Sequence, residues 1–246
     1  MSLISKASLR MIRNLLRVFV LTLMAKEKSK TTQAMDELQA SVRPLLKELG
    51  FRGRARAFNR TTSDGITQVI EFQLGRFDPP GTQYVGFRQN LYGKFTVNVG
   101  VYVPEMHKYT YPGGGELPFV HEYDCWIRAR LGTVGPEHHD IWWDLESVHE
   151  QAAEVFHRIE RDALPFLARF ETRDAILQQW KQENSDVSKF ARSRQQTACA
   201  IIMAIRGRRD EARSILSAAL RQLADHPSAQ MVRGLFEKLG LGEPES

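Results

Sequence analysis

The feature that most constrains the fold is residues 94–103, where apolar and polar or small residues alternate. Phe95, Val97, Val99, Val101 and Val103 alternate with Lys94, Thr96, Asn98, Gly100 and Tyr102. Successive side chains of a strand point to opposite faces of a sheet, so this period predicts a strand with one covered face and one largely solvated face. Such a strand is typical of antiparallel sheets and argues against a doubly wound parallel sheet.

Three further segments predict strands. The segments 54–60 and 66–74 flank the turn-rich linker 61–65, which suits a hairpin. The segment 121–131 would place His121 and Cys125 on one face and Glu122 and Asp124 on the other.

Helices are predicted on both sides of these strands. Residues 31–49 carry an apolar stripe that Pro44 is expected to kink or divide. Helical patterns return from Ser147 onward and continue to the C-terminal end. The later helices are expected at 190–206, 209–224 and 228–239.

The fold class is therefore α+β: a mainly antiparallel sheet of about four or five strands, flanked by helices and followed by a helical C-terminal tail. We expect an N-terminal extension at 1–26, an α+β domain at 27–183 and a helical region at 184–246. Residues 198–227 resemble a single tetratricopeptide-like helical hairpin. Because such repeats need neighbours to bury their faces, we favour a tail packed on the sheet domain.

The basic character of the chain comes from its first residues. The sequence pI is about 9.3, and residues 1–26 hold five of the 34 Lys and Arg and no acid. Without those five, 29 basic residues balance 29 acidic ones. A net field that would steer the remaining chain to a polyanion is absent, so no nucleic-acid partner is expected.

Three interpretations of residues 1–26 remain open. Met24 is a plausible true start, in which case the preceding residues are an artefact of start-site choice. A basic amphipathic helix on a membrane surface is the second interpretation, and it is the only basis for a membrane partner. A signal peptide is the third, although Arg17 shortens its apolar stretch.

Cysteine usage favours a reducing compartment. Cys125 and Cys199 lie far apart and form no metal-binding or paired spacing. We therefore expect a cytoplasmic protein.

Four short segments, taken in order, resemble a bacterial family named domain of unknown function 4304. They are Leu46–Phe51, Phe58–Thr62, Gln73–Phe77 and Asn90–Asn98. The resemblance covers about residues 30–165 and leaves the C-terminal helices outside. It implies an α+β domain and carries no activity, cofactor or site residue with it.

The candidate chemistry centres on histidines. His121, His138 and His139 lie near carboxylates and are residue types that zinc or iron could use. No HExxH or other fixed spacing joins them, and strand alternation separates His121 from Glu122 and Asp124. Solvated loop histidines are the simpler interpretation. A metal-dependent or hydrolytic enzyme that uses this region is the alternative function.

Other catalytic patterns are absent or weak. Cys125 lies on the apolar face of a strand, where a thiol usually packs as a small hydrophobe. The run 113–115 is glycine without the Lys-Ser/Thr of a phosphate-binding loop. We assign no catalytic residue, no metal ligand and no cofactor.

The preferred hypothesis is a non-enzymatic binding module for a protein partner. Long irregular stretches at 75–93 and 104–120 are rich in Gly, Pro and Tyr, and such loops often carry binding surfaces. A ladder of arginines along the first strand could bind an acidic protein patch, although a solvated edge strand is the better explanation. The candidate binding residues are Arg52, Arg54, Arg56, Arg60, Arg76 and Tyr92.

Overall fold

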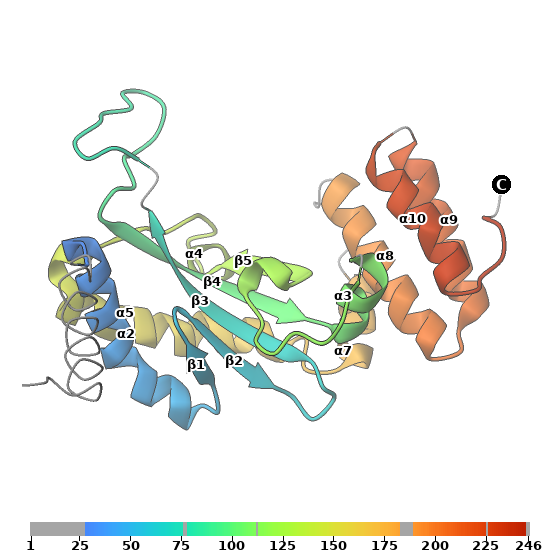
Figure 1. Ribbon diagram of the computed structural model, residues 1–246, viewed down its shortest axis with the longest axis horizontal. Helices are drawn as coiled ribbons and strands as arrows, with labels where there is room; N and C mark the ends of the chain where they lie inside the picture. Colours follow the sequence, from blue (N-terminus) through green and yellow to red (C-terminus); the bar gives the residue numbers. More distant parts are fainter. Residues whose placement is uncertain (1–27, 76–77, 112, 183–188, 225, 245–246) are drawn as a thin grey trace, which may run out of the picture.

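The computed structural model describes residues 28–75, 78–111, 113–182, 189–224 and 226–244. Its centre is a six-stranded antiparallel sheet in the order β1-β2-β3-β4-β5, with β6 paired to the start of β4 (Figure 1). The strands are β1 (Arg52–Arg54), β2 (Ala57–Thr61), β3 (Thr67–Gly75), β4 (Lys94–Tyr102), β5 (Ile127–Arg130) and β6 (Trp143–Asp144). The predicted α+β class with an antiparallel sheet is confirmed.

Two strand predictions were wrong in extent. The segment 54–60 is not one strand, because a tight turn at Ala55, with φ of 49°, separates β1 from β2. The segment 121–131 begins with a 3-10 turn, η1 (Glu122–Asp124), and only Ile127–Arg130 pairs with β4. The side chain of Asp124 accepts a hydrogen bond from the His121 backbone N–H, which favours the turn over an extended strand.

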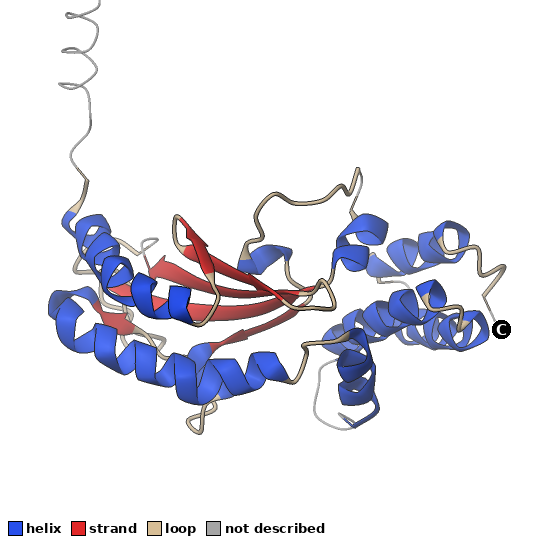
Figure 2. Cartoon of the chain, turned by 90° about the horizontal axis from the view of Figure 1, so that it is seen from below, coloured by secondary structure: helices blue, strands red, loops and turns tan. Residues whose placement is uncertain are grey.

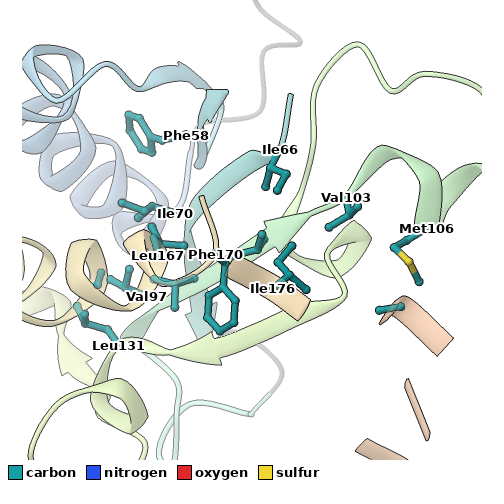
Figure 3. Packing of buried hydrophobic residues seen from close by; sticks show 14 of the residues in the cluster. Phe58, Ile66, Ile70, Val97, Val103, Met106, Leu131, Leu167, Phe170 and Ile176 are labelled. Atoms are coloured by element: carbon teal, nitrogen blue, oxygen red, sulfur yellow. The ribbon is translucent and has the colours of Figure 1, made fainter. Parts of the chain in front are cut away.

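Helices cover one face of the sheet. The long helix α2 (Lys30–Glu48) lies beside α5 (Val148–Arg158), which continues through a π-helical turn, η3 (Ile159–Ala163), into α6 (Leu164–Ala168) (Figure 2). Ile70, Val97 and Leu167 meet between the sheet and α6 (Figure 3). Short elements complete this part of the chain: α3 (Pro104–Thr110), α4 (Leu131–Val134) and η2 (Leu145–Ser147).

Helix α2 shows that burial outweighs a local defect. Pro44 lies inside it, and of the two expected outcomes, a kink or a division into two pieces, the division does not occur, because the helix runs unbroken to Glu48. Pro44 removes one backbone hydrogen bond, whereas Val42 and Leu46 on the same helix are fully buried. Gly50 follows the helix with φ of 86°, the left-handed conformation in which many helices end.

The second long irregular stretch is partly helical. Pro104 occupies the first turn of α3, where its fixed φ suits a helix start. The prediction of a loop throughout 104–120 was therefore wrong.

The C-terminal helices are α7 (Arg173–Gln182), α8 (Lys189–Ile205), α9 (Arg209–Leu223) and α10 (Ser228–Lys238). Helices α8 and α9 pack as a hairpin that turns at Gly207, with φ of 81°. Helices α8 and α10 lie beside α3 (Figure 1), and the Lys238 ammonium of α10 donates a hydrogen bond of 2.9 Å to the Tyr109 carbonyl. The tail thus contacts the sheet-bearing part of the chain, as expected.

Within the described residues, no helix combines the length and apolar character needed to cross a bilayer. The interpretations of residues 1–26 concern a segment outside the described residues.

Candidate functional site

The loop between β3 and β4 projects away from the sheet (Figure 1). We call its residues 78–93 the arm. The arm has the size of an Ω-loop, a class of compact loop that is frequently functional.

A single carboxylate closes the arm. The Asp78 side chain accepts hydrogen bonds from two Arg88 nitrogens, at 2.6 and 2.7 Å. It also accepts one from the Leu91 backbone N–H at 2.7 Å and one from the Tyr84 hydroxyl at 3.3 Å. The Arg88 guanidinium lies 4.1 Å from the centre of the Tyr84 ring. One buried acid at the start of the arm therefore binds three later residues, Tyr84, Arg88 and Leu91.

The electrostatics of this cluster fix its charge state. Hydrogen bonds from Arg88, and then from the Leu91 backbone N–H, hold the pKa of Asp78 well below its usual range. Asp78 raises the pKa of Arg88 in turn. Both side chains stay charged at neutral pH.

A second side chain, Asn90, orders the arm. Its amide nitrogen donates to the carbonyls of Pro79 and Thr82, at 2.9 and 2.7 Å, and its oxygen accepts from the Tyr92 N–H at 2.7 Å. The base of the arm also packs tightly on β3, since a Cβ at Gly75 would lie 2.3 Å from the Leu91 carbonyl oxygen.

Apolar side chains point outward from this ordered frame. Val85 is 89% exposed and Phe87 is 83% exposed, on either side of Gly86. Gly86 has φ of 71°, a conformation that glycine adopts without strain. Tyr92, a predicted binding residue, is 42% exposed near the arm's base. The arm therefore presents Val85 and Phe87 to the surroundings instead of burying them.

The predicted arginine ladder does not form as one row. Arg52 and Arg54 are exposed on β1, opposite Asn59 and Ala57 in register. Arg60 lies on the other face of the sheet. Its Nε donates to Gln68 Oε1 at 2.9 Å, and its guanidinium lies 4.7 Å from the Phe51 ring centre.

Arg60 thus supports the fold, and burial lowers its pKa. Arg56 is half-buried beside the turn and interacts within the chain. Arg76 lies outside the described residues. Of the predicted arginines that the structure describes, Arg52 and Arg54 keep the exposure that a binding role needs.

The histidines of the alternative hypothesis lie in separate settings. His121 Nδ1 is 3.0 Å from Glu71 Oε1, a contact that orients its ring. His139 Nδ1 is 2.9 Å from the Glu137 carbonyl oxygen. Among the described residues, no three His, Cys, Asp or Glu side chains are grouped so that they could hold a metal ion.

The cysteines are packed as apolar groups. Cys125 is 1% exposed, and burial raises its pKa well above the usual thiol value. Burial raises the pKa of Cys199 to about 12. Both thiols are therefore neutral at physiological pH, and neither has the electropositive setting of a reactive thiolate.

Sequence reasoning missed the arrangement of Asp78, Arg88 and Asn90. The available signal was Asp78 followed by Pro-Pro-Gly, a turn-forming sequence. That local sequence does not predict that the Asp78 carboxylate pairs with Arg88.

One protein family matches the part of the chain that holds the sheet and the arm. Residues 42–169 match the family described as Domain of unknown function (DUF4304). The chain belongs to the DUF4304 family. The DUF4304 match includes the arm and all six strands and ends before α7, as the resemblance implied. No curated protein and no solved structure matches the chain.

Proposed function

We propose that this protein is a binding module that inserts the tip of its arm into an apolar recess of a partner protein. The observation that carries the proposal is the exposure of Val85 and Phe87 on a loop whose backbone is fixed from within. Large apolar side chains that are held out in water favour association, because burial in a partner removes them from solvent.

The internal bonds of the arm matter for affinity. A flexible loop loses conformational entropy when it is ordered by binding, which lowers the affinity. A preorganised loop is already ordered and loses little further entropy. Asp78 and Asn90 hold the arm before any partner arrives. Phe87 is thus the natural anchor, since aromatic side chains at the centre of an interface contribute most to binding.

Charge favours a protein recess over a lipid surface or a nucleic acid. The arm contains one acid and one base, Asp78 and Arg88, and these neutralise each other. Loops that insert into anionic membranes usually combine apolar and unpaired basic residues. Nucleic-acid sites need several free cations.

Arg52 and Arg54 provide a second, weaker contribution. Both are exposed on β1 and form no ion pair within the described residues. Exposed charges at the rim of an interface mainly change the association rate and its salt dependence. We expect them to attract an acidic patch on the same partner.

The test is affinity capture with the full-length chain from native lysate, followed by mass spectrometry. The wild type is compared with the double variant Val85→Ser/Phe87→Ser and with Ile205→Ser, a matched change at an apolar residue that is 47% exposed outside the arm. Loss of a hot-spot anchor costs about 2 kcal/mol or more, a decrease in affinity of about 30-fold.

A partner that is retained by the wild type and by Ile205→Ser, and lost with the arm variant, supports the proposal. A partner that binds all three proteins equally contradicts it. Equal melting temperatures of the three proteins establish that the arm variant is folded.

A further inference from the structure

A second candidate site, this one concave, lies between the sheet and the C-terminal helices. It is a cleft of about 340 Å³. Aromatic residues from the sheet-bearing part and aliphatic residues from α9 and α10 line it. The main wall residues are Tyr111, Tyr123, Trp126, Leu223, Met231 and Val232.

Arg194 of α8 also lines the cleft and is the unusual residue in it. Its guanidinium lies 5.0 Å from the Trp126 ring centre, and the side chain is half-buried. Among the described residues, no carboxylate forms an ion pair with Arg194. Burial, and then repulsion from Arg128, lower its pKa.

The neighbouring cation is already neutralised. Arg128 donates to both carboxylate oxygens of Glu122, at 2.6 and 2.8 Å. Glu122 is itself buried, and both of its carboxylate oxygens are taken by Arg128. Arg194 is therefore left without an ion pair among the described residues, while Asp124 and Glu71 act on the neighbouring Tyr123.

A guanidinium that is partly withdrawn from water and has no ion-pair partner lowers the stability of a fold unless a ligand compensates it. Arginine is also well suited to hold a carboxylate or phosphate, because its planar fork can donate two parallel hydrogen bonds. The cation–π contact of Arg194 with Trp126 restricts the position of that fork in advance.

We propose that this cleft binds a small organic anion. Its carboxylate or phosphate group pairs with Arg194, and its apolar or aromatic body lies between Trp126 and the Met231–Val232 wall. A mostly apolar lining with a few convergent polar groups is the usual composition of a small-ligand site. The cleft volume is near the lower end of the range for such sites, about 300–1,000 Å³, which limits the body to about one ring.

This site is independent of the arm. It uses residues of α8, α9 and α10, which lie beyond the family match, together with Trp126 and the tyrosines on the sheet side. Binding at the cleft can fail or succeed without any effect on capture of a partner by the arm.

The test is calorimetric titration of the full-length protein with benzoate and with phenyl phosphate. Benzyl alcohol is the neutral control, and inorganic phosphate is the control without a ring. We expect saturable binding of at least one aromatic anion. Benzyl alcohol and inorganic phosphate should each bind about tenfold more weakly or worse, because each lacks one of the two contacts.

Two variants locate the site. Arg194→Gln should weaken binding at least about tenfold, because it removes the cation and its fork. Met231→Trp leaves Arg194 in place and fills the cleft, so it should also weaken binding. Arg233→Gln is the matched control, since Arg233 is exposed on α10 and does not line the cleft.

The melting temperature of an Arg194 variant distinguishes a ligand-binding role of Arg194 from a purely structural role. If Arg194 serves a ligand, Arg194→Met should leave the melting temperature of the ligand-free protein unchanged or raise it. The proposal is overturned if neither aromatic anion binds, if benzyl alcohol binds as tightly as benzoate, or if Arg194→Gln and Met231→Trp both bind like the wild type. A melting temperature that falls with Arg194→Met, while anion affinity is unchanged in Arg194→Gln, also overturns it.

Discussion

The buried carboxylate of Asp78 accepts two hydrogen bonds from the guanidinium of Arg88, ten residues further along the chain. This pair joins the start of the arm to its later part and gives the long loop a defined conformation. Val85 and Phe87 lie between the two closing residues in sequence, so the pair determines how the tip is presented. The expected behaviour of the arm follows from this contact.

Asp78→Asn should loosen the arm without unfolding the protein. The amide cannot accept both Arg88 nitrogens and the Leu91 N–H as a charged group does, so those bonds weaken. Hydrogen exchange at the Leu91 amide should become faster by about tenfold or more. The melting temperature should change little, because the arm lies outside the core. Asp144→Asn, which removes an exposed partner of Lys94, is the control and should leave Leu91 exchange unchanged.

The closed arm should withstand mild acid. The pKa of Asp78 is depressed in the folded state, so its stabilising effect is fully present above its unfolded value of about 3.9. It is lost only as pH falls through the lower, folded value. The protection factor at Leu91 should therefore stay constant from pH 8 to about pH 4 and decline below. In Arg88→Gln the decline should begin at a higher pH; an unchanged profile in that variant would refute the role of Arg88.

The sequence predicted the parts of the fold that depend on local periodicity. The alternation at Phe95, Val97 and Val99 identified a strand, and all three are fully buried on the helix-covered face. Pro44 shows the limit of local reasoning, because the burial of Val42 and Leu46 maintains a helix through a residue that normally interrupts one.

The candidate sites depend on contacts between distant residues, which periodicity cannot show. Tyr92 lies on the arm, but the Asp78–Arg88 pair that shapes the arm requires the folded loop. Arg60 seemed a surface cation in the sequence, whereas a turn at Ala55 reverses the chain and Arg60 lies against Phe51. Trp126 and Arg194 meet only because α8 returns to the sheet.

Gln68 should prove essential to the core. It is fully buried; its amide nitrogen donates to the Leu167 carbonyl at 2.9 Å, and its oxygen accepts from Arg60. In Gln68→Leu the Leu167 carbonyl and the Arg60 guanidinium both lose their hydrogen bond to residue 68. The free energy of unfolding should therefore fall by about 1–3 kcal/mol. Urea denaturation measures this loss. Gln222→Leu on the exposed side of α9 should stay within about 0.5 kcal/mol of the wild type.

Two glycine-to-alanine substitutions should change the stability of the protein in opposite directions. At Gly100 a Cβ would lie 2.7 Å from Cys125 Sγ and 2.8 Å from Cys125 Cβ, so Gly100→Ala should destabilise the protein by about 1–3 kcal/mol. At Gly234, within α10, a Cβ meets open space, and Gly234→Ala should stabilise by up to about 1 kcal/mol. The melting temperatures of the two variants, compared with that of the wild type, test both predictions. A neutral Gly100→Ala would mean that the segment carrying Cys125 does not pack on β4 as described.

The central claim, that the arm tip contacts a partner protein, is tested most directly by site-specific photo-crosslinking in the native cell. Benzoylphenylalanine in place of Phe87 keeps an aromatic ring at the tip, and the same residue in place of Ile205 serves as the control. The account predicts one dominant protein adduct from position 87 and none of that mass from position 205. Adducts from position 205 and none from position 87 would contradict it.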